Sequence, residues 1–162
     1  MKVTDYGPRI APFDNHLRFR EGLVGVEVGV DAGAHAEAMV RYLDIRKLTL
    51  IDPWPNDYIR GLCEGRFFTE RRRVELIRGE SAKVAPRFPT EHFDFIYCDL
   101  PQDGPMAKQA LADWWPRLKL GGVFGYRNYT TSWPDMKQVI DEFVASKGLT
   151  THVEVGEIVI RK

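Results

Sequence analysis

Short apolar segments alternate with segments of helical periodicity from residue 22 onward, and this order constrains the fold more than any other feature. Ala36, Met39, Val40 and Leu43, for example, fall on one face of a helix. Strands separated by helices are joined by right-handed crossovers and lie parallel. The sequence therefore predicts an α/β protein with a doubly wound sheet and helices on both faces. The predicted parallel strands are Leu23–Val28, Leu48–Ile51, Val74–Ile77, Phe93–Cys98 and Val123–Tyr126.

The last part of the sequence has clear helix and hairpin signals. Ser132 is suited to cap a helix, Pro134 fits its first turn, and Gly148 fits its end. Two β-rich segments then follow around a glycine, at Thr151–Val155 and Glu157–Arg161. Such a pair predicts a β-hairpin, which adds an antiparallel strand to the parallel sheet.

The first 21 residues lack this alternation and form an irregular arm, whereas residues 22–162 are predicted to form one domain. The arm carries the scattered apolar residues Ile10, Phe13, Leu17 and Phe19. It could cover either the domain or a neighbouring subunit, and its aromatic side chains make a homodimer one of the open alternatives.

The charge balance and the two cysteines indicate which partners and which cellular compartment to expect. Lysine plus arginine and aspartate plus glutamate number 23 each, so the chain has no overall attraction to nucleic acid or to a membrane surface. Cys98 lies in an apolar strand, and the two cysteines do not indicate a disulfide framework. No apolar run is long enough for a signal peptide or a membrane span. We expect a cytoplasmic protein with a small-molecule substrate and with no nucleic-acid or membrane partner.

Ligands of open α/β sheets bind beyond the carboxyl ends of the strands, so the residues after each strand are the candidates for a site. After the first strand, Gly29 and Gly33 allow a tight turn and a close approach of the backbone to a ligand. The turn lacks a full G-x-G-x-x-G pattern, which disfavours a pyrophosphate. The alternative is that these glycines only connect a strand to a helix.

Asp52 follows the second strand, where a carboxylate can accept hydrogen bonds from both hydroxyls of a ribose. Pro53 and Trp54 come next and could line the face of an adenine. For Trp54 an equally good interpretation is a core residue behind a loop stiffened by proline.

The third and fourth strands are also followed by polar residues. Gly79, Glu80 and Ser81 follow the third strand, and Glu80 or Ser81 could accept a hydrogen bond from an adenine amino group. Gly79 or Ser81 could instead cap a helix, and the two roles are compatible. Asp99 ends an apolar strand and should face the cleft, because burying an unpaired carboxylate is costly.

In this order and spacing, the residues resemble the class I S-adenosylmethionine (AdoMet) dependent methyltransferases over residues 22–161. The resemblance implies a seven-stranded, mostly parallel, Rossmann-like sheet with a C-terminal antiparallel hairpin, and AdoMet as cofactor. Small-molecule O-methyltransferases of the macrocin type are the most similar subgroup, through the strings VEVGV, LIDPW and ADWWPRLKLGGVFGYRNY. The residues implied to bind the cofactor are Glu27, Gly29, Val30, Gly33, Asp52, Pro53, Trp54, Gly79, Glu80, Ser81, Asp99 and Leu100.

The sequence departs from this subgroup where the subgroup holds magnesium. Asp99 is followed by leucine and proline rather than by a further acid and histidine, and the fifth strand ends in Arg127-Asn128 rather than in an acid. A hard cation prefers several oxygen ligands and more than one carboxylate, and Arg127 would repel it. We therefore predict no metal site.

The candidates for catalysis are few. Asp99 could act as a general base, and Arg127 could orient an anionic substrate, although Arg127 could equally pair with an aspartate. His35 and His16 are further candidate bases, but His35 also fits the start of a helix and His16 lies in the arm. The first hypothesis is a metal-independent methyltransferase acting on a small molecule. The second is a lapsed methyltransferase-like module that only binds AdoMet or S-adenosylhomocysteine. A nicotinamide-dependent oxidoreductase is third, because it would share the ribose acid.

Overall fold

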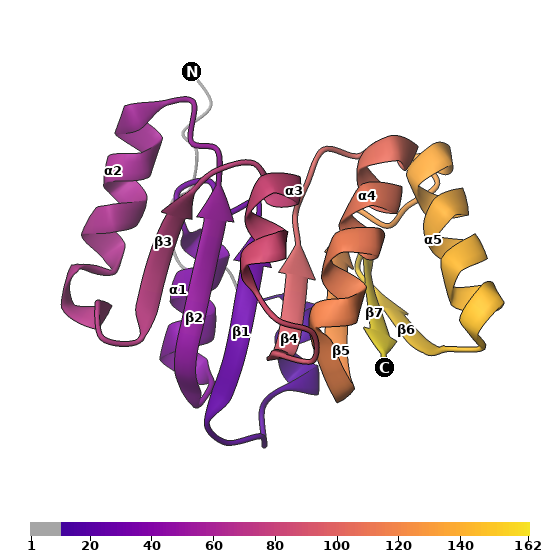
Figure 1. Cartoon of the computed structure of the whole chain (residues 1–162), viewed down its shortest axis with the longest axis horizontal. Coiled ribbons are helices and arrows are strands. Elements are labelled where there is room, and N and C mark those ends of the chain that lie inside the picture. Colours follow the sequence, from indigo (N-terminus) through magenta and orange to yellow (C-terminus); the bar gives the residue numbers. More distant parts are fainter. Residues whose placement is uncertain (1–10) are drawn as a thin grey trace.

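A computed structural model describes residues 11–162, which form a seven-stranded sheet in the order β3-β2-β1-β4-β5-β7-β6 (Figure 1). The strands are β1 (Leu23–Val28), β2 (Ile45–Asp52), β3 (Val74–Arg78), β4 (Phe93–Cys98), β5 (Leu118–Arg127), β6 (Thr150–Glu154) and β7 (Glu157–Arg161). The α-helices are α1 (Ala34–Tyr42), α2 (Asp57–Arg66), α3 (Ser81–Val84), α4 (Gly104–Trp114) and α5 (Pro134–Lys147). Short 3-10 helices are η1 (Pro12–His16), η2 (Phe68–Glu70), η3 (Ala85–Arg87) and η4 (Trp115–Arg117).

The predicted sheet is confirmed. Strands β1 to β5 pair in parallel, and β7 pairs antiparallel with both β5 and β6. β1 and β4 are neighbours, but the chain leaves β1 toward β2 and leaves β4 toward β5. This is the point at which the winding of the sheet reverses, and ligands of doubly wound sheets bind at its carboxyl-terminal edge.

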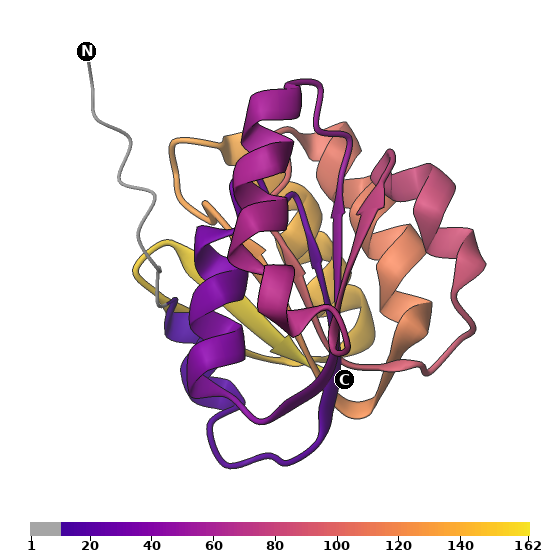
Figure 2. The same cartoon turned by 90° about the vertical axis from the view of Figure 1, so that its left-hand side faces the viewer.

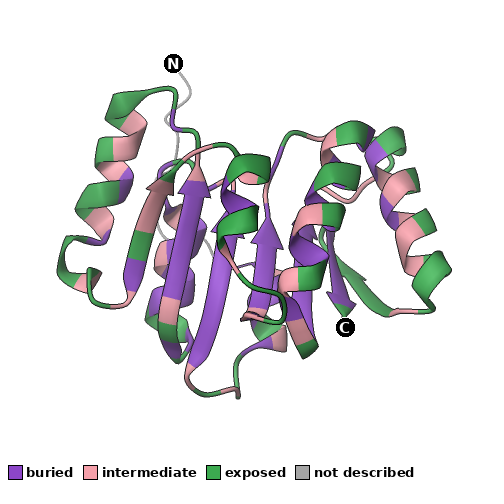
Figure 3. Ribbon diagram, viewed as in Figure 1, coloured by how far each residue is buried: buried purple, intermediate pink, exposed green. Residues whose placement is uncertain are grey.

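Each face of the sheet has its own hydrophobic core, because successive strand residues point to opposite sides. Val26 and Val28 of β1 belong to a core beneath α3, α4 and α5, which we call the cavity-side core. Phe95 and Tyr97 of β4 belong to the other core, beneath η1, α1 and α2, which we call the arm-side core. Figure 2 shows the two sets of helices on opposite faces. Figure 3 shows that the central strands are buried, β1 at every position and β4 at every position but Asp94, whereas β6 is exposed along its length.

The structure corrects two local predictions. β5 begins at Leu118, so Gly121 and Gly122 lie inside the strand and pair with the C-terminal Lys162 through backbone hydrogen bonds. Ser132 does not cap α5, whose N-cap is Trp133 with no side-chain cap bond. The αL conformation of Gly148 at the end of α5 agrees with the prediction.

Part of the predicted arm belongs to the arm-side core. Phe13 and Leu17 are fully buried, and a β-carbon added to Gly125 would come within 2.4 Å of the Phe13 ring. Gly125 therefore makes room for Phe13 on the surface of β5. Phe19 is 96% exposed, and Ile10 lies outside the described residues, so the homodimer stays a prediction. No helix within residues 11–162 is long and apolar enough to cross a membrane.

Candidate functional site

A cavity of about 520 Å³ opens at the carboxyl ends of β1, β2 and β4, next to α3 and α4. It lies at the reversal point of the sheet, where the sequence placed the site. Among the sequence-predicted residues, those that line it are Gly29, Asp52, Pro53, Glu80, Ser81, Asp99 and Leu100. The predicted residues Glu27, Val30, Gly33, Trp54 and Gly79 are not part of its lining.

The two glycines of the β1–α1 turn have different roles. Gly29 has a φ of 84°, and a β-carbon on it would come within 2.1 Å of the Asp99 carbonyl oxygen. Only glycine lets this turn lie so close to the end of β4. Gly33, with a φ of 82°, precedes α1 and faces Cys63 and Phe67 of the α2 region rather than the cavity. Gly33 therefore serves helix packing.

Asp52 joins the turns that follow β1 and β2. Its Oδ2 accepts hydrogen bonds from the backbone N–H groups of Val30 (2.9 Å) and Asp31 (3.0 Å), and its Oδ1 accepts one from Trp54 (2.7 Å). A carboxylate has roughly four acceptor positions, so these amides use most of them. The side chain of Val30 is buried in the arm-side core, and this residue contributes its amide to the turn.

Pro53 and Trp54 separate at this turn. Pro53 is exposed and lines the cavity, whereas Trp54 is 1% exposed and donates from Nε1 to the Asp31 carbonyl oxygen at 2.8 Å. Its indole belongs to the arm-side core, so the core interpretation of Trp54 describes the structure and the adenine-stacking interpretation does not. The side chains of these two neighbours therefore lie in different environments.

The β3–α3 turn brings Glu80 and Ser81 to the cavity. Ser81 Oγ accepts a hydrogen bond from Trp114 Nε1 at 2.8 Å, which ties α3 to α4. The N-cap of α3 is Glu80, with no side-chain cap bond, so neither Ser81 nor Gly79 is the cap. Gly79 instead faces Val84, whose methyl group would lie 2.7 Å from an added β-carbon.

Asp99 and Arg127 form an ion pair at the ends of β4 and β5, with 2.6 Å between Oδ2 and Nη1. Burial opposes the charge of the guanidinium, but the hydrogen bond and charge of Asp99 outweigh it and raise the pKa of Arg127. Asp99 lines the cavity, whereas Arg127 is not part of its lining and contacts Asp99 from behind this wall. The sequence-based alternative that Arg127 pairs with an aspartate is thus confirmed.

On the arm side of the same edge, His35 lies between two acids. Its Nδ1 is 3.1 Å from Glu27 Oε1, and its Nε2 is 3.0 Å from Asp14 Oδ1. Burial lowers the pKa of the imidazole, but the two carboxylates outweigh it and raise the pKa to about 10. His35 is therefore protonated at neutral pH and cannot act as the general base. Glu27 is 2% exposed in this cluster, turned to the face opposite the cavity.

The remaining histidine candidate also lies away from the cavity. His16 of η1 is 3.3 Å from Arg161 Nη2, and its ring centroid is 5.1 Å from that of His152 on β6. Burial, Arg161 and His152 together lower the pKa of His16. Since His16 does not line the cavity, its position does not support a role as base.

Sequence reasoning missed the contribution of α4. Asp103, Met106, Gln109 and Ala110 line the cavity from this helix. Met106 and Ala110 are at helical spacing in the sequence. Asp103 is the N-cap of α4, and its Oδ1 accepts a 2.7 Å hydrogen bond from the Met106 amide. Which turn of α4 faces the cavity depends on how α4 packs on α3, and the sequence alone does not reveal that packing.

A comparison with protein-family models matches residues 26–129 to the family described as a methyltransferase domain. The chain belongs to this methyltransferase family. The match includes the turns after β1, β2, β3 and β4 that form the cavity. The expectation of an AdoMet-dependent methyltransferase is thereby confirmed at the level of the family. A comparison with curated proteins finds no match.

Solved structures share the fold of this methyltransferase at low sequence identity. A Corynebacterium glutamicum protein has a TM-score of 0.76 at 16% identity, covering 93% of this chain and 78% of its own. The TDP-rhamnose 3'-O-methyltransferase of calicheamicin biosynthesis has a TM-score of 0.66 at 16% identity, covering 92% and 75%. The mycinamycin-pathway methyltransferase MycE, solved with magnesium and S-adenosylhomocysteine, has a TM-score of 0.66 at 16% identity, covering 93% and 48%.

Proposed function

We propose that this methyltransferase binds AdoMet in the cavity at the β1–β4 reversal point and methylates a small molecule without a metal ion. The observation that carries the proposal is the position of Asp52, a half-buried carboxylate on the cavity wall at the end of β2. Its backbone partners leave about one acceptor position, so we propose that it accepts one ribose hydroxyl rather than both.

The charge of the cavity fits AdoMet better than a dinucleotide. Asp52, Glu80, Asp99 and Asp103 line it, and no lysine, arginine or histidine is among the described residues of its wall. AdoMet carries a sulfonium and an ammonium group, which nearby carboxylates stabilise, whereas they repel a pyrophosphate. This electrostatic environment disfavours the nicotinamide-dependent oxidoreductase.

The residues of the cavity would act mainly by positioning. AdoMet supplies an activated methyl group, so the protein needs to provide proximity and alignment. Gly29 lets the backbone approach the ligand, and Pro53, Leu100 and Met106 supply apolar walls that exclude water. The Asp99–Arg127 pair fixes the ends of β4 and β5, where we place the acceptor.

Independence from metal is supported by the same ion pair. Asp99 is the acid that would be the first candidate to hold magnesium, and a guanidinium occupies its Oδ2. A divalent cation would have to compete with this charge, and the described residues contain no group of three or more His, Cys, Asp or Glu side chains placed to hold a metal ion. The similarity to macrocin-type enzymes therefore does not extend, in our proposal, to their metal.

A second candidate function is a binding module without turnover, and one observation favours it. Asp99 already accepts a hydrogen bond from Arg127, and the described cavity wall contains no histidine or cysteine to act as base. An alcohol acceptor needs such a base, whereas an amine or thiolate needs less. An active enzyme without such a base would therefore favour amine or thiolate acceptors over alcohols.

Isothermal titration calorimetry with AdoMet, S-adenosylhomocysteine and NAD tests the proposal. We expect binding of the first two and not of NAD, because of the acidic wall. Binding of NAD alone, or of none of the three, would refute the proposed cofactor. Transfer of labelled methyl groups to a panel of amines, thiols, phenols and sugars then separates the enzyme from the module.

A further inference from the structure

Tyr126 of β5 carries a buried hydroxyl for which the described residues provide no hydrogen-bond partner. Two other large polar side chains of the cores, Tyr97 and Trp114, are paired. Tyr97 donates to Glu157 Oε1 at 2.6 Å, and Trp114 donates to Ser81 Oγ at 2.8 Å. Tyr126 is thus an exception, and a buried polar group without a partner calls for an explanation.

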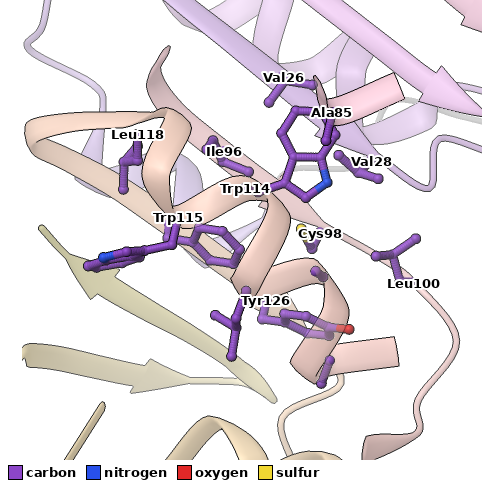
Figure 4. Close-up of a cluster of buried hydrophobic side chains, with 14 of the residues drawn as sticks. Val26, Val28, Ala85, Ile96, Cys98, Leu100, Trp114, Trp115, Leu118 and Tyr126 are labelled. Atoms are coloured by element: carbon purple, nitrogen blue, oxygen red, sulfur yellow. The ribbon is translucent and has the colours of Figure 1, made fainter. Parts of the chain in front are cut away.

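The hydroxyl lies close to the cavity wall. Tyr126 pairs in register with Cys98 and belongs to the cavity-side core with Leu100 and Ala110, both of which line the cavity. Figure 4 shows its oxygen directed away from Trp115, toward the side of the cluster on which Leu100 lies. Burial raises the pKa of the phenol, and the nearby carboxylates of Asp103 and Asp99 raise it further. The group therefore stays protonated and acts as a hydrogen-bond donor.

The N-terminus of α4 offers a matching acceptor. Asp103, the N-cap of α4, is exposed and uses Oδ1 to accept the Met106 amide. The same helix carries Met106, Gln109 and Ala110 into the cavity wall. A ligand that fills the cavity would cover Asp103 and remove water from its carboxylate, which strengthens any hydrogen bond to a neighbouring donor.

We propose that Tyr126 is a positioning residue, whose hydroxyl donates to the Asp103 carboxylate when AdoMet is bound and so draws the first turn of α4 onto the ligand. The proposal rests on the proposed function, because it needs a ligand in this cavity. It explains why a tyrosine stands where phenylalanine would fill the same space without an unpaired hydroxyl.

The test is Tyr126→Phe, with AdoMet affinity measured by calorimetry and stability measured by urea unfolding of the ligand-free protein. We expect the Kd for AdoMet to rise roughly 10- to 150-fold, the usual effect of losing one hydrogen bond to a charged group. The unfolding midpoint should stay unchanged or rise, since the variant removes an unpaired polar atom. Opposite effects on binding and stability distinguish a positioning role from a structural one.

Two further variants identify the partner and provide the control. Asp103→Asn should weaken AdoMet binding, and the double variant with Tyr126→Phe should lose less than the product of the two single effects. Tyr97→Phe, the paired tyrosine, should lower the unfolding midpoint and leave the Kd of the folded protein unchanged. Hydrogen exchange of the backbone amides of residues 102–104 and of Met106 should slow on binding AdoMet, and slow less in Tyr126→Phe.

The outcomes separate the two proposals. AdoMet binding by Tyr126→Phe with wild-type affinity would overturn the positioning role and leave the proposed function standing. Fully multiplicative effects of Tyr126→Phe and Asp103→Asn would overturn Asp103 as the partner. Failure of the wild-type protein to bind AdoMet would refute the proposed function and this inference with it.

Discussion

At the carboxyl-terminal edge of the sheet, the acids on the arm side are buried and paired, whereas those on the cavity side line an open space. Asp14, Glu27 and Glu157 are each less than 7% exposed and have His35, Tyr97 or a backbone amide as partners. Asp52 and Asp99 are half-buried and belong to the cavity wall. The two sides of one sheet edge thus use the same residue type differently. The arm side pairs its acids in a buried cluster, and the cavity side leaves Asp52 and Asp99 on the wall of an open cavity.

The largest effect is expected from removing His35, the buried cation that pairs with the acids of the arm side. His35→Ala leaves Asp14 and Glu27 buried without their shared partner, so the free energy of unfolding should fall by about 3–5 kcal/mol. Urea unfolding measures this change. His152→Ala, which removes an exposed ion pair with Glu154, is the control and should change stability by less than about 1 kcal/mol. Equal effects of the two variants would contradict a buried ionic cluster.

The next effect is a pH dependence of stability that comes from His35 on the arm side. The pKa of His35 is raised from 6.5 to about 10, so its stabilising contribution is complete below pH 6.5 and is lost as pH rises through 10. The free energy of unfolding should therefore fall between pH 7 and pH 10, by at most about 1.4 kcal/mol per pH unit for one proton. His35→Gln should lack this part of the slope, and an unchanged slope would contradict the assignment.

A smaller effect is expected on the cavity side, and it concerns binding. Asp52→Ala removes the proposed ribose acceptor and should weaken AdoMet binding by on the order of 2 kcal/mol. The amides of Val30, Asp31 and Trp54 lose their acceptor too, so circular dichroism must first show that the variant is folded. Glu64→Ala removes an exposed acid of α2 and is the matched control. Unchanged affinity of Asp52→Ala would count against Asp52 as a ligand contact.

The smallest expected effect is that of metal removal. Because Arg127 already neutralises Asp99, EDTA should leave AdoMet binding and any methyl transfer unchanged within error. Activity that EDTA abolishes and magnesium restores would show that the cavity side holds a cation after all.

The sequence predicted the elements better than the contacts between them. The bounds of Phe93–Cys98 were correct because this run is apolar and ends at Asp99, a local signal. The start of β5 was wrong because Gly121 and Gly122 pair with Lys162, which is a distant part of the chain.

The site shows the same limit. Gly29, Asp52 and Asp99 reached the cavity as expected, because strand ends are fixed by topology. The direction of Trp54, the partner of Glu27 and the wall formed by α4 depend on tertiary packing. His35 shows this most clearly, since its partner Asp14 lies in the arm, where no periodic pattern suggested a contact.

The packing of Phe13 has a consequence for folding during protein synthesis. Its ring lies against Gly125, and its amide donates to Glu157 Oε2, so a segment translated early depends on strands translated late. Contacts of such long sequence separation form slowly and cannot form on the ribosome until residue 157 has emerged. During synthesis the arm-side core therefore stays open, and the segment that carries Phe13 remains unpacked until β5 and Glu157 have emerged.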